Sequence, residues 1–110
     1  MMELNSNNYG VVLVTVGTKE AGKAIAQSLV QAKLAACVNI LPIDSIYLWQ
    51  GEINQDCEYQ LIIKTDLDKF DELSHKIKTL HTYEVPEIIA LPIVAGAKSY
   101  LDWLGNCLQP

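Results

Sequence analysis

The segment 81–87 concentrates the polar side chains of this sequence that could do chemistry. It is composed of His-Thr-Tyr-Glu-Val-Pro-Glu and places one imidazole and two carboxylates close together along the chain. Such a group could hold a divalent cation, because imidazole suits copper or zinc. The alternative interpretation is structural. His81 and Glu84 would then hydrogen-bond neighbouring backbone, while the Val-Pro pair shapes the entry to the next strand.

No catalytic arrangement can be named in the rest of the chain. None of the serines stands in a nucleophile–base–orienter pattern, and there is no Walker-type phosphate loop. The sequence has no CxxC pair to carry a metal and no Arg to hold a phosphoryl group. We therefore expect a protein that is not an enzyme.

The charge composition argues against a nucleic-acid partner. The formal net charge is −5, and all eight cationic residues are Lys. Phosphate and base recognition favour a basic surface and the planar fork of Arg, both of which are missing here. No uninterrupted apolar run approaches the length of a membrane span, so we also expect no membrane insertion.

The N-terminus and the cysteines indicate a cytoplasmic protein. Residues 1–9 are polar and lack the basic start and apolar centre of a signal peptide, which predicts a flexible tail before a domain at 10–110. The three cysteines form an odd set without a CxxC motif, and they are expected to be reduced thiols.

Two long strand-like arms, joined at Gln50 and Gly51, must position the polar segment. The second arm alternates, with Ile53, Cys57, Tyr59, Leu61 and Ile63 on the face expected to be buried. A straight arm of about 14 residues would span about 46 Å, whereas a domain of this size is only about 34 Å across. The hairpin must therefore bend or project, and its apolar tip (Tyr47, Leu48, Trp49) calls for a cover such as another copy of the chain.

The remaining elements follow from apolar spacing and capping residues. A glycine-bounded strand is predicted at 10–17, a helix from Thr18 to about Leu34, and a second helix from Asp66 or Asp68 to about Leu80. The first helix should turn an apolar stripe inward: Ala21, Ala24, Ile25, Leu29 and Ala32. A strand over 87–94 and a terminal helix of about ten residues after Gly96 complete the chain, with Tyr100, Leu101 and Leu104 facing inward.

This element order predicts the fold class. The succession β-α-β-β-α-β with an extra C-terminal helix is typical of an α+β, ferredoxin-like domain. Such a domain has an antiparallel sheet with both main helices on one face. Because this fold serves many functions, function has to be argued from the site.

The sequence also resembles a known family, the CutA proteins, named for divalent-cation tolerance. The resemblance covers about residues 10–103, and the block Tyr-Glu-Val-Pro-Glu at 83–87 is its most specific part. The other motifs are Ala-Ala-Cys-Val-Asn-Ile at 35–40, Ile-Tyr-Leu-Trp-Gln-Gly at 46–51, Leu-Ile-Ile-Lys-Thr at 61–65 and Tyr-Leu-Asp-Trp at 100–103. It implies a ferredoxin-like subunit in a tight homotrimer, similar in shape to PII-type signalling proteins.

The resemblance also bears on the metal. Some members are described as copper binders through a Cys near the end of the first strand and a His pair before the Tyr-Glu-Val-Pro-Glu block. Val14 occupies the first position here and the pair is Leu80-His81, so only His81 remains. Soft thiolate ligation is therefore absent at that place.

These observations lead to two hypotheses. The first is a non-enzymatic cytoplasmic homotrimer that binds a metal ion (copper or zinc) or a small ligand in clefts between subunits. Its expected site residues are His81, Glu84, Tyr83 and Lys64, and its expected interface residues are Tyr47, Leu48, Trp49, Pro86 and Ile88. The alternative is a PII-like structural or signalling trimer that acts through protein partners without a metal site of its own.

Overall fold

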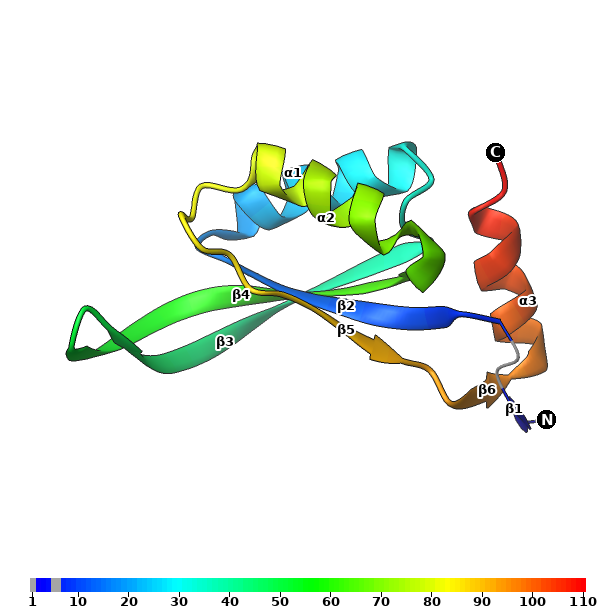
Figure 1. Ribbon diagram of the computed structural model, residues 1–110, viewed down its shortest axis with the longest axis horizontal. Coiled ribbons are helices and arrows are strands. Elements are labelled where there is room, and N and C mark those ends of the chain that lie inside the picture. The colour runs from blue at the N-terminus through cyan, green and yellow to red at the C-terminus, as the bar shows by residue number, and fades with distance from the viewer. Residues whose placement is uncertain (1, 5–6) are drawn as a thin grey trace.

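A four-stranded antiparallel sheet with two helices on one face organises the chain (Figure 1). The computed structural model describes residues 2–4 and 7–110. The sheet order is β3-β4-β2-β5, and the strands are β2 (Tyr9–Val16), β3 (Cys37–Trp49), β4 (Glu52–Asp66) and β5 (Ile88–Pro92). The helices are α1 (Lys19–Gln31), the 3-10 turn η1 (Leu67–Lys69), α2 (Phe70–Leu80) and α3 (Lys98–Cys107). A small second sheet pairs β1 (Met2–Leu4) with β6 (Ala95–Ala97).

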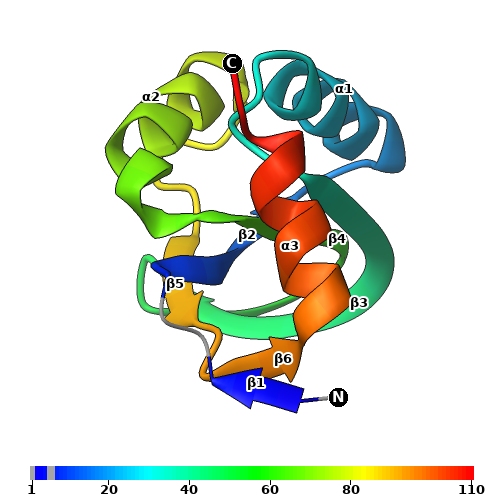
Figure 2. The same ribbon diagram turned by 90° about the vertical axis from the view of Figure 1, so that its right-hand side faces the viewer.

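The predicted β-α-β-β-α-β order and antiparallel pairing are confirmed for the main sheet, whereas the small β1–β6 sheet was not predicted. The helices α1 and α2 lie side by side over one face of the sheet, and α3 stands at the end remote from the hairpin tip (Figures 1 and 2). The other face of the main sheet carries no helix of the described residues, and we call it the open face. No helix within the described ranges is long and apolar enough to cross a membrane.

Local capping explains where the helices begin. The Thr18 side chain accepts a hydrogen bond from the Ala21 N–H at 3.1 Å, as expected of an N-cap. Asp66 caps η1 in the same way through the Asp68 N–H at 2.9 Å. The helix α1 stops at Gln31, earlier than predicted, because Lys33 adopts a left-handed φ of 59° that ends the helical path.

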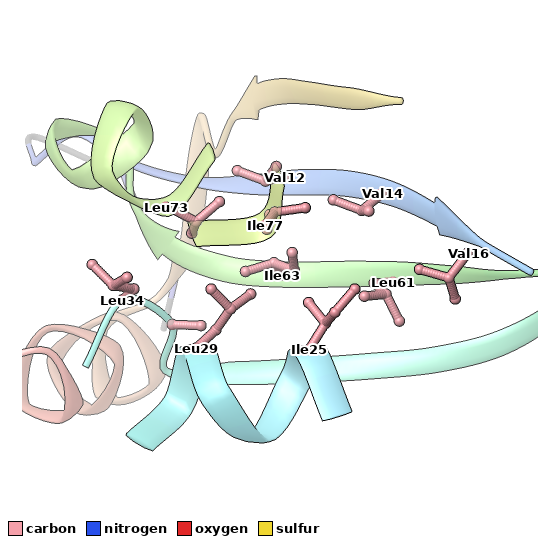
Figure 3. Packing of buried hydrophobic residues seen from close by; sticks show 11 residues of the cluster. Val12, Val14, Val16, Ile25, Leu29, Leu34, Leu61, Ile63, Leu73 and Ile77 are labelled. Carbon is pink, nitrogen blue, oxygen red and sulfur yellow. The ribbon is translucent and has the colours of Figure 1, made fainter. Parts of the chain in front are cut away.

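The core lies between the helix-covered face of the sheet and α1 and α2 (Figure 3). Alternate residues of β2 and β4 meet aliphatic side chains of both helices. The members that the figure labels are Val12, Val14, Val16, Ile25, Leu29, Leu34, Leu61, Ile63, Leu73 and Ile77. Such burial is the main favourable term that holds the sheet and helices together.

The β3–β4 hairpin projects beyond the helices (Figure 1). Its register pairs Cys37 with Lys64 and Trp49 with Glu52. The turn residues Gln50 and Gly51 have φ values of 51° and 80°, the positive values typical of a tight hairpin turn. The molecule measures 46 × 26 × 21 Å, so of the two expected alternatives, a bent or a projecting hairpin, the tip projects.

Two expectations about the apolar stripe of α1 need correction. Ala24 is exposed, because the close contact between helix and sheet is made instead by the buried Gly22. Ala32 is exposed as well, since the helix has already ended at Gln31.

Burial also differs from the prediction at α3 and on the hairpin. Tyr100 is exposed on α3, whereas Leu101 and Leu104 are buried as predicted. Ile53 and Cys57 are exposed because the hairpin carries them past the helices.

Two boundaries also differ from the prediction. The last strand of the main sheet is shorter than 87–94, ending at Pro92, which pairs with Gly10. Within the expected tail, β1 pairs with β6. Residues 1 and 5–6 of that expected tail lie outside the described residues.

Candidate functional site

A cleft of about 780 Å³ lies between the hairpin and the segment that connects α2 to β5. We call it the hairpin cleft. Its walls combine carboxylates, hydroxyls and aromatic rings. The lining residues are Thr15, Asp44, Ser45, Ile46, Tyr47, Trp49, Glu58, Thr82, Tyr83, Glu84, Val85 and Glu87. A volume of this size is typical of small-ligand sites, which span about 300–1,000 Å³.

Tyr83 and Glu58 form the closest polar contact across this cleft. The Tyr83 hydroxyl donates to Glu58 Oε2 at 2.6 Å. Glu58 lies on the open face of β4, yet it is only 7% exposed. Burial and, after it, the hydrogen bond to Glu58 raise the pKa of the Tyr83 phenol well above its ordinary value. Tyr83 therefore stays a neutral donor throughout the physiological range.

Glu87 joins the connecting segment to two strands of the sheet. Its Oε2 accepts from Thr15 Oγ1 at 3.3 Å and from Gln60 Nε2 at 3.2 Å. Thr15 and Gln60 are register partners on β2 and β4, so one carboxylate bridges both strands. The contact fixes the floor of the hairpin cleft beside Glu58.

Both ring nitrogens of His81 form hydrogen bonds with backbone atoms. Its Nε2 lies 2.7 Å from the Thr15 carbonyl oxygen, which can only accept, so Nε2 carries the proton. Its Nδ1 accepts from the Tyr83 N–H at 3.0 Å. The two rings also contact each other, with centroids 4.7 Å apart. Both ring nitrogens of His81 therefore engage backbone, which is the arrangement that the structural interpretation describes.

The hairpin wall of the cleft is also acidic. The Tyr47 hydroxyl donates to Asp56, a hydrogen bond that raises the pKa of this phenol. Cys57 lies 3.5 Å from Asp44 Oδ1, and this contact raises the pKa of the thiol.

The donor set does not fit a preformed copper or zinc site. Such sites need several nitrogen or sulfur ligands that converge on one point. Within residues 2–4 and 7–110, no group of three His, Cys, Asp or Glu side chains could hold an ion. His81 would also have to give up a backbone hydrogen bond to coordinate a metal.

The structure divides the predicted site residues into two places. Tyr83 and Glu84 line the hairpin cleft, and His81 contacts Tyr83 from outside the lining. Lys64 lies elsewhere on the open face, where it donates to Asn39. Six residues of β4 separate Lys64 from Glu58, a distance of about 20 Å along the strand.

The predicted interface residues also occupy different positions. Tyr47, Leu48 and Trp49 are exposed near the hairpin tip, as the patterning predicts. Pro86 is half-buried, and Ile88 packs against the core of its own chain. The neighbouring β5 residues Ile89 and Leu91, together with Leu41 of β3, are the exposed apolar side chains of the open face.

Sequence reasoning missed Glu58 and Thr15 as members of the cleft. Glu58 lies on the polar side of the alternating second arm and Thr15 in the strand predicted at 10–17, and neither was named as a candidate. A signal was present in the sequence: Thr15 is a lone polar side chain in a β-branched apolar run. It indicates a place where the sheet meets polar partners.

Fold and site together define a ferredoxin-like α+β protein with an uncovered sheet face and an acidic cleft beside its projecting hairpin. A family model described as CutA1 divalent ion tolerance protein matches residues 10–107, nearly the whole chain. This chain therefore belongs to the CutA family of divalent-cation tolerance proteins.

Individual relatives agree with this assignment. Divalent-cation tolerance protein CutA of Thermus thermophilus is 53% identical over 95 residues, which covers 86% of this chain and 92% of that protein. Protein CutA, chloroplastic, of Arabidopsis thaliana is 53% identical over 97 residues. There the match spans 87% of this chain but only 53% of the plant protein.

A solved structure supports the fold. The periplasmic divalent cation tolerance protein CutA from Archaeoglobus fulgidus superposes with a TM-score of 0.90 at 39% sequence identity. The match covers 92% of this chain and 99% of that one. The α+β fold with its four-stranded antiparallel sheet is therefore that of CutA structures.

Proposed function

We propose that this CutA protein acts as a non-enzymatic homotrimer that binds a small ligand in the hairpin cleft, closed by a neighbouring subunit. The observation that carries the proposal is the position of the cleft. It lies beside exposed apolar residues of the hairpin tip, so a subunit that covered the tip would also border the cleft.

The uncovered apolar surface supports assembly. Leu48 and Ile53 near the hairpin tip are 71% and 77% exposed, and Leu41, Ile89 and Leu91 lie exposed on the open face. Exposed apolar patches mark interaction sites on soluble proteins. Burying it against other copies would stabilise the assembly as obligate interfaces do.

The two edge strands of the main sheet support assembly of the subunits into a ring. Among the described residues, β3 and β5 are the edge strands of the main sheet, each with one neighbouring strand. Unpaired strand edges readily accept another strand. If β3 of one copy meets β5 of the next, the contact is head-to-tail, and head-to-tail contacts close into rings when the rotation permits.

Solution mass tests the assembly. Light scattering at micromolar protein should return three times the 12.2 kDa mass of the chain. Replacing Leu91 with Lys places a charge on the open face and should lower that mass, whereas the exposed helix substitution Glu72→Lys should not. A wild-type mass of a single chain would refute the trimer and the inter-subunit cleft with it.

Calorimetry tests whether the ligand is a metal ion or another small molecule. Cu²⁺ and Zn²⁺ would be titrated into wild type, His81→Ala and the control His75→Ala, whose side chain is exposed on α2. Heat lost only in His81→Ala would support metal binding near His81. Equal heats for all three proteins would remove His81 as a ligand, in agreement with its two backbone hydrogen bonds.

A PII-like signalling trimer without its own metal site is the second candidate. The observation that favours it is that no ligand group for a metal converges among the described residues. Affinity capture from native lysate, with a Trp49→Ala variant as control, would test it. Clear binding of a small ligand with no specific protein recovered would count against this candidate.

Cytoplasmic location is part of the proposal. The names of relatives point to more than one compartment, since one is called chloroplastic and one periplasmic. Fractionation of the native cells with an antibody to this chain would decide it. Recovery with a periplasmic or organelle marker would overturn the cytoplasmic assignment.

A further inference from the structure

We propose that residues 82–86 form a gate over the hairpin cleft and that His81 is the positioning residue that holds this gate closed. We call residues 82–86 the gate segment. Four of its members line the cleft: Thr82, Tyr83, Glu84 and Val85. The inference deepens the proposed function, since it concerns regulation of the same cleft, and it rests on that function for a ligand to admit.

The gate segment is held by side chains rather than by backbone pairing. Among the described residues, no backbone–backbone hydrogen bond is formed by residues 82–86. The chain is fixed just before them, where the His81 N–H donates to the Ile77 carbonyl oxygen at 2.8 Å, and again at Ile88, which pairs with Val14 in the sheet. A stretch without backbone hydrogen bonds between two fixed ends can open locally while the rest of the domain stays folded.

The His81 ring joins the gate segment to the sheet, and it can do so only in its neutral form. Its Nε2 donates to the Thr15 carbonyl oxygen of β2 at 2.7 Å, and its Nδ1 accepts from the Tyr83 N–H at 3.0 Å. A backbone N–H only donates, so Nδ1 must keep its lone pair. A proton on Nδ1 would face the proton of the Tyr83 N–H, and this hydrogen bond would be lost.

Tyr83 is the member of the gate segment that reaches across the cleft. Its hydroxyl donates to Glu58 Oε2 at 2.6 Å, and its ring contacts the His81 ring with centroids 4.7 Å apart. The hydroxyl also lies close to the Gly17 backbone, where an added Cβ would come within 3.2 Å of it. Because both the N–H and the ring of Tyr83 contact His81, loss of the His81 contact releases the residue that closes the cleft beside Glu58.

The surroundings of His81 show which interaction its protonation would change. Its neighbouring elements carry few charged groups, and β2 carries none. These groups are Glu84 and Glu87 of its own connection, Glu58 of β4, Lys78 in the last turn of α2, and Lys19 and Glu20 at the start of α1. Within the described ranges His81 forms no ion pair with any of them. Protonation of the ring therefore removes the hydrogen bond to Tyr83 and breaks no salt bridge.

Hydrogen exchange at the Tyr83 amide tests the gate. It would be followed by NMR on the intact protein from pH 7.5 to pH 5.5, with each rate divided by the intrinsic exchange rate at that pH. In wild type, the protection factor of this amide should fall roughly tenfold over the range. That is the change expected when the open state carries a free imidazole that titrates near pH 6.5 and the closed state requires the neutral ring.

Three variants assign the response to a residue. In His81→Asn, the side-chain oxygen can still accept from the N–H two residues on but does not titrate, so protection should become independent of pH. Glu58→Gln keeps an oxygen acceptor for the Tyr83 hydroxyl and should retain the tenfold fall. His75→Asn, on the exposed face of α2, should retain it as well. A fall that persists in His81→Asn and disappears in Glu58→Gln would overturn the proposal.

The ring itself can be observed in the wild-type chain, which contains only two histidines. Imidazole nitrogen shifts, assigned with His75→Asn, should show the proton of His81 on Nε2 at pH 7.5. The loss of protection at Tyr83 should follow the titration of His81 and not that of His75. A proton on Nδ1 at pH 7.5, or unchanged protection while His81 gains its second proton, would overturn the proposal even if the His81 variant failed to fold.

These measurements require neither a ligand nor an assembly, so the gate and the proposed function can fail separately. A trimeric mass and a bound ligand, together with a gate segment that does not respond to His81, would refute the gate and leave the proposed function standing. A single-chain mass would refute the trimer, whereas the exchange rates would still decide whether His81 holds the gate segment.

Discussion

The two halves of β4 carry the same alternating pattern and meet different surroundings. Near the helices, Leu61 and Ile63 are fully buried beneath α1 and α2. Toward the hairpin tip, Ile53 points from the same side of the strand but is largely exposed. Alternation therefore shows which side chains share a face, whereas the reach of the helices decides whether that face is covered.

The largest loss of stability should come from a substitution in the helix-covered half of β4. Leu61→Ala leaves a cavity in the core and should lower the free energy of unfolding by about 2–5 kcal/mol, measured by chemical denaturation. The matched variant Ile53→Ala should change it by about 0.5 kcal/mol or less if the hairpin tip stays in water. A loss in Ile53→Ala as large as that in Leu61→Ala would place Ile53 inside an interface.

The next largest effect should be a weaker trimer when an aromatic side chain is removed from the projecting half of the hairpin. Trp49 is 45% exposed near the hairpin tip, and Trp49→Ala should weaken the proposed trimer by about 2–4 kcal/mol per site. Sedimentation at low concentration would detect the dissociation. Val30→Ala, an exposed apolar change on α1, is the control. An unchanged sedimentation profile for Trp49→Ala would show that this ring is not an anchor.

Substitutions in the hairpin turn should change stability less than this, and in opposite directions at Gly51 and Gln50. Gly51 has a φ of 80°, so Gly51→Ala should cost about 1–2 kcal/mol of stability. Gln50 has a φ of 51°, and Gln50→Gly should relieve that conformation and stabilise the hairpin slightly. Thermal unfolding of both variants checks the pair; destabilisation by Gln50→Gly would contradict the account.

The smallest loss of stability should come from the contact between Tyr83 and Glu58 of β4. Tyr83→Phe removes the hydrogen bond to Glu58 and should cost about 0.5–1.5 kcal/mol near neutral pH. The raised pKa means that folded Tyr83 keeps its proton where the unfolded phenol, with a pKa of about 10, loses it. Its contribution is thus fully present below about pH 10 and declines as the pH rises above that value.

Denaturation at pH 8 and above pH 10 would measure this decline. Wild type should lose more stability between the two conditions than Tyr83→Phe does. Tyr59→Phe, which alters a ring packed against the core, is the control. If wild type and Tyr83→Phe lost the same amount, the Tyr83–Glu58 contact would not contribute to the alkaline decline.

Much of the fold could be predicted from local signals. Thr18 and Asp66 mark helix starts because a side-chain oxygen satisfies a free N–H of the first turn. The Gln-Gly pair marks the hairpin turn, and the register that follows from this turn pairs Cys37 with Lys64. These features depend on neighbours in sequence, so the sequence carries them directly.

The candidate site could be predicted only in part. The segment 81–87 was identified, but Lys64 was grouped with it and Glu58 was not. The tertiary structure decides both cases. Glu58 meets Tyr83 of the segment before β5, while Lys64 lies six residues farther along the same face of β4 and donates a hydrogen bond to Asn39 instead. The role of His81 could not be chosen from sequence, because an imidazole can bind metal or backbone equally well.

By itself, the sequence determined the order of the elements, the faces of the strands and the length of the hairpin. These follow from periodicity, capping and the fixed rise of a strand. Only the tertiary structure decided that Glu58 is buried, that both His81 nitrogens are occupied, and that four carboxylates border one cleft. Such properties arise where segments far apart in sequence meet, and no local pattern encodes the distances between them.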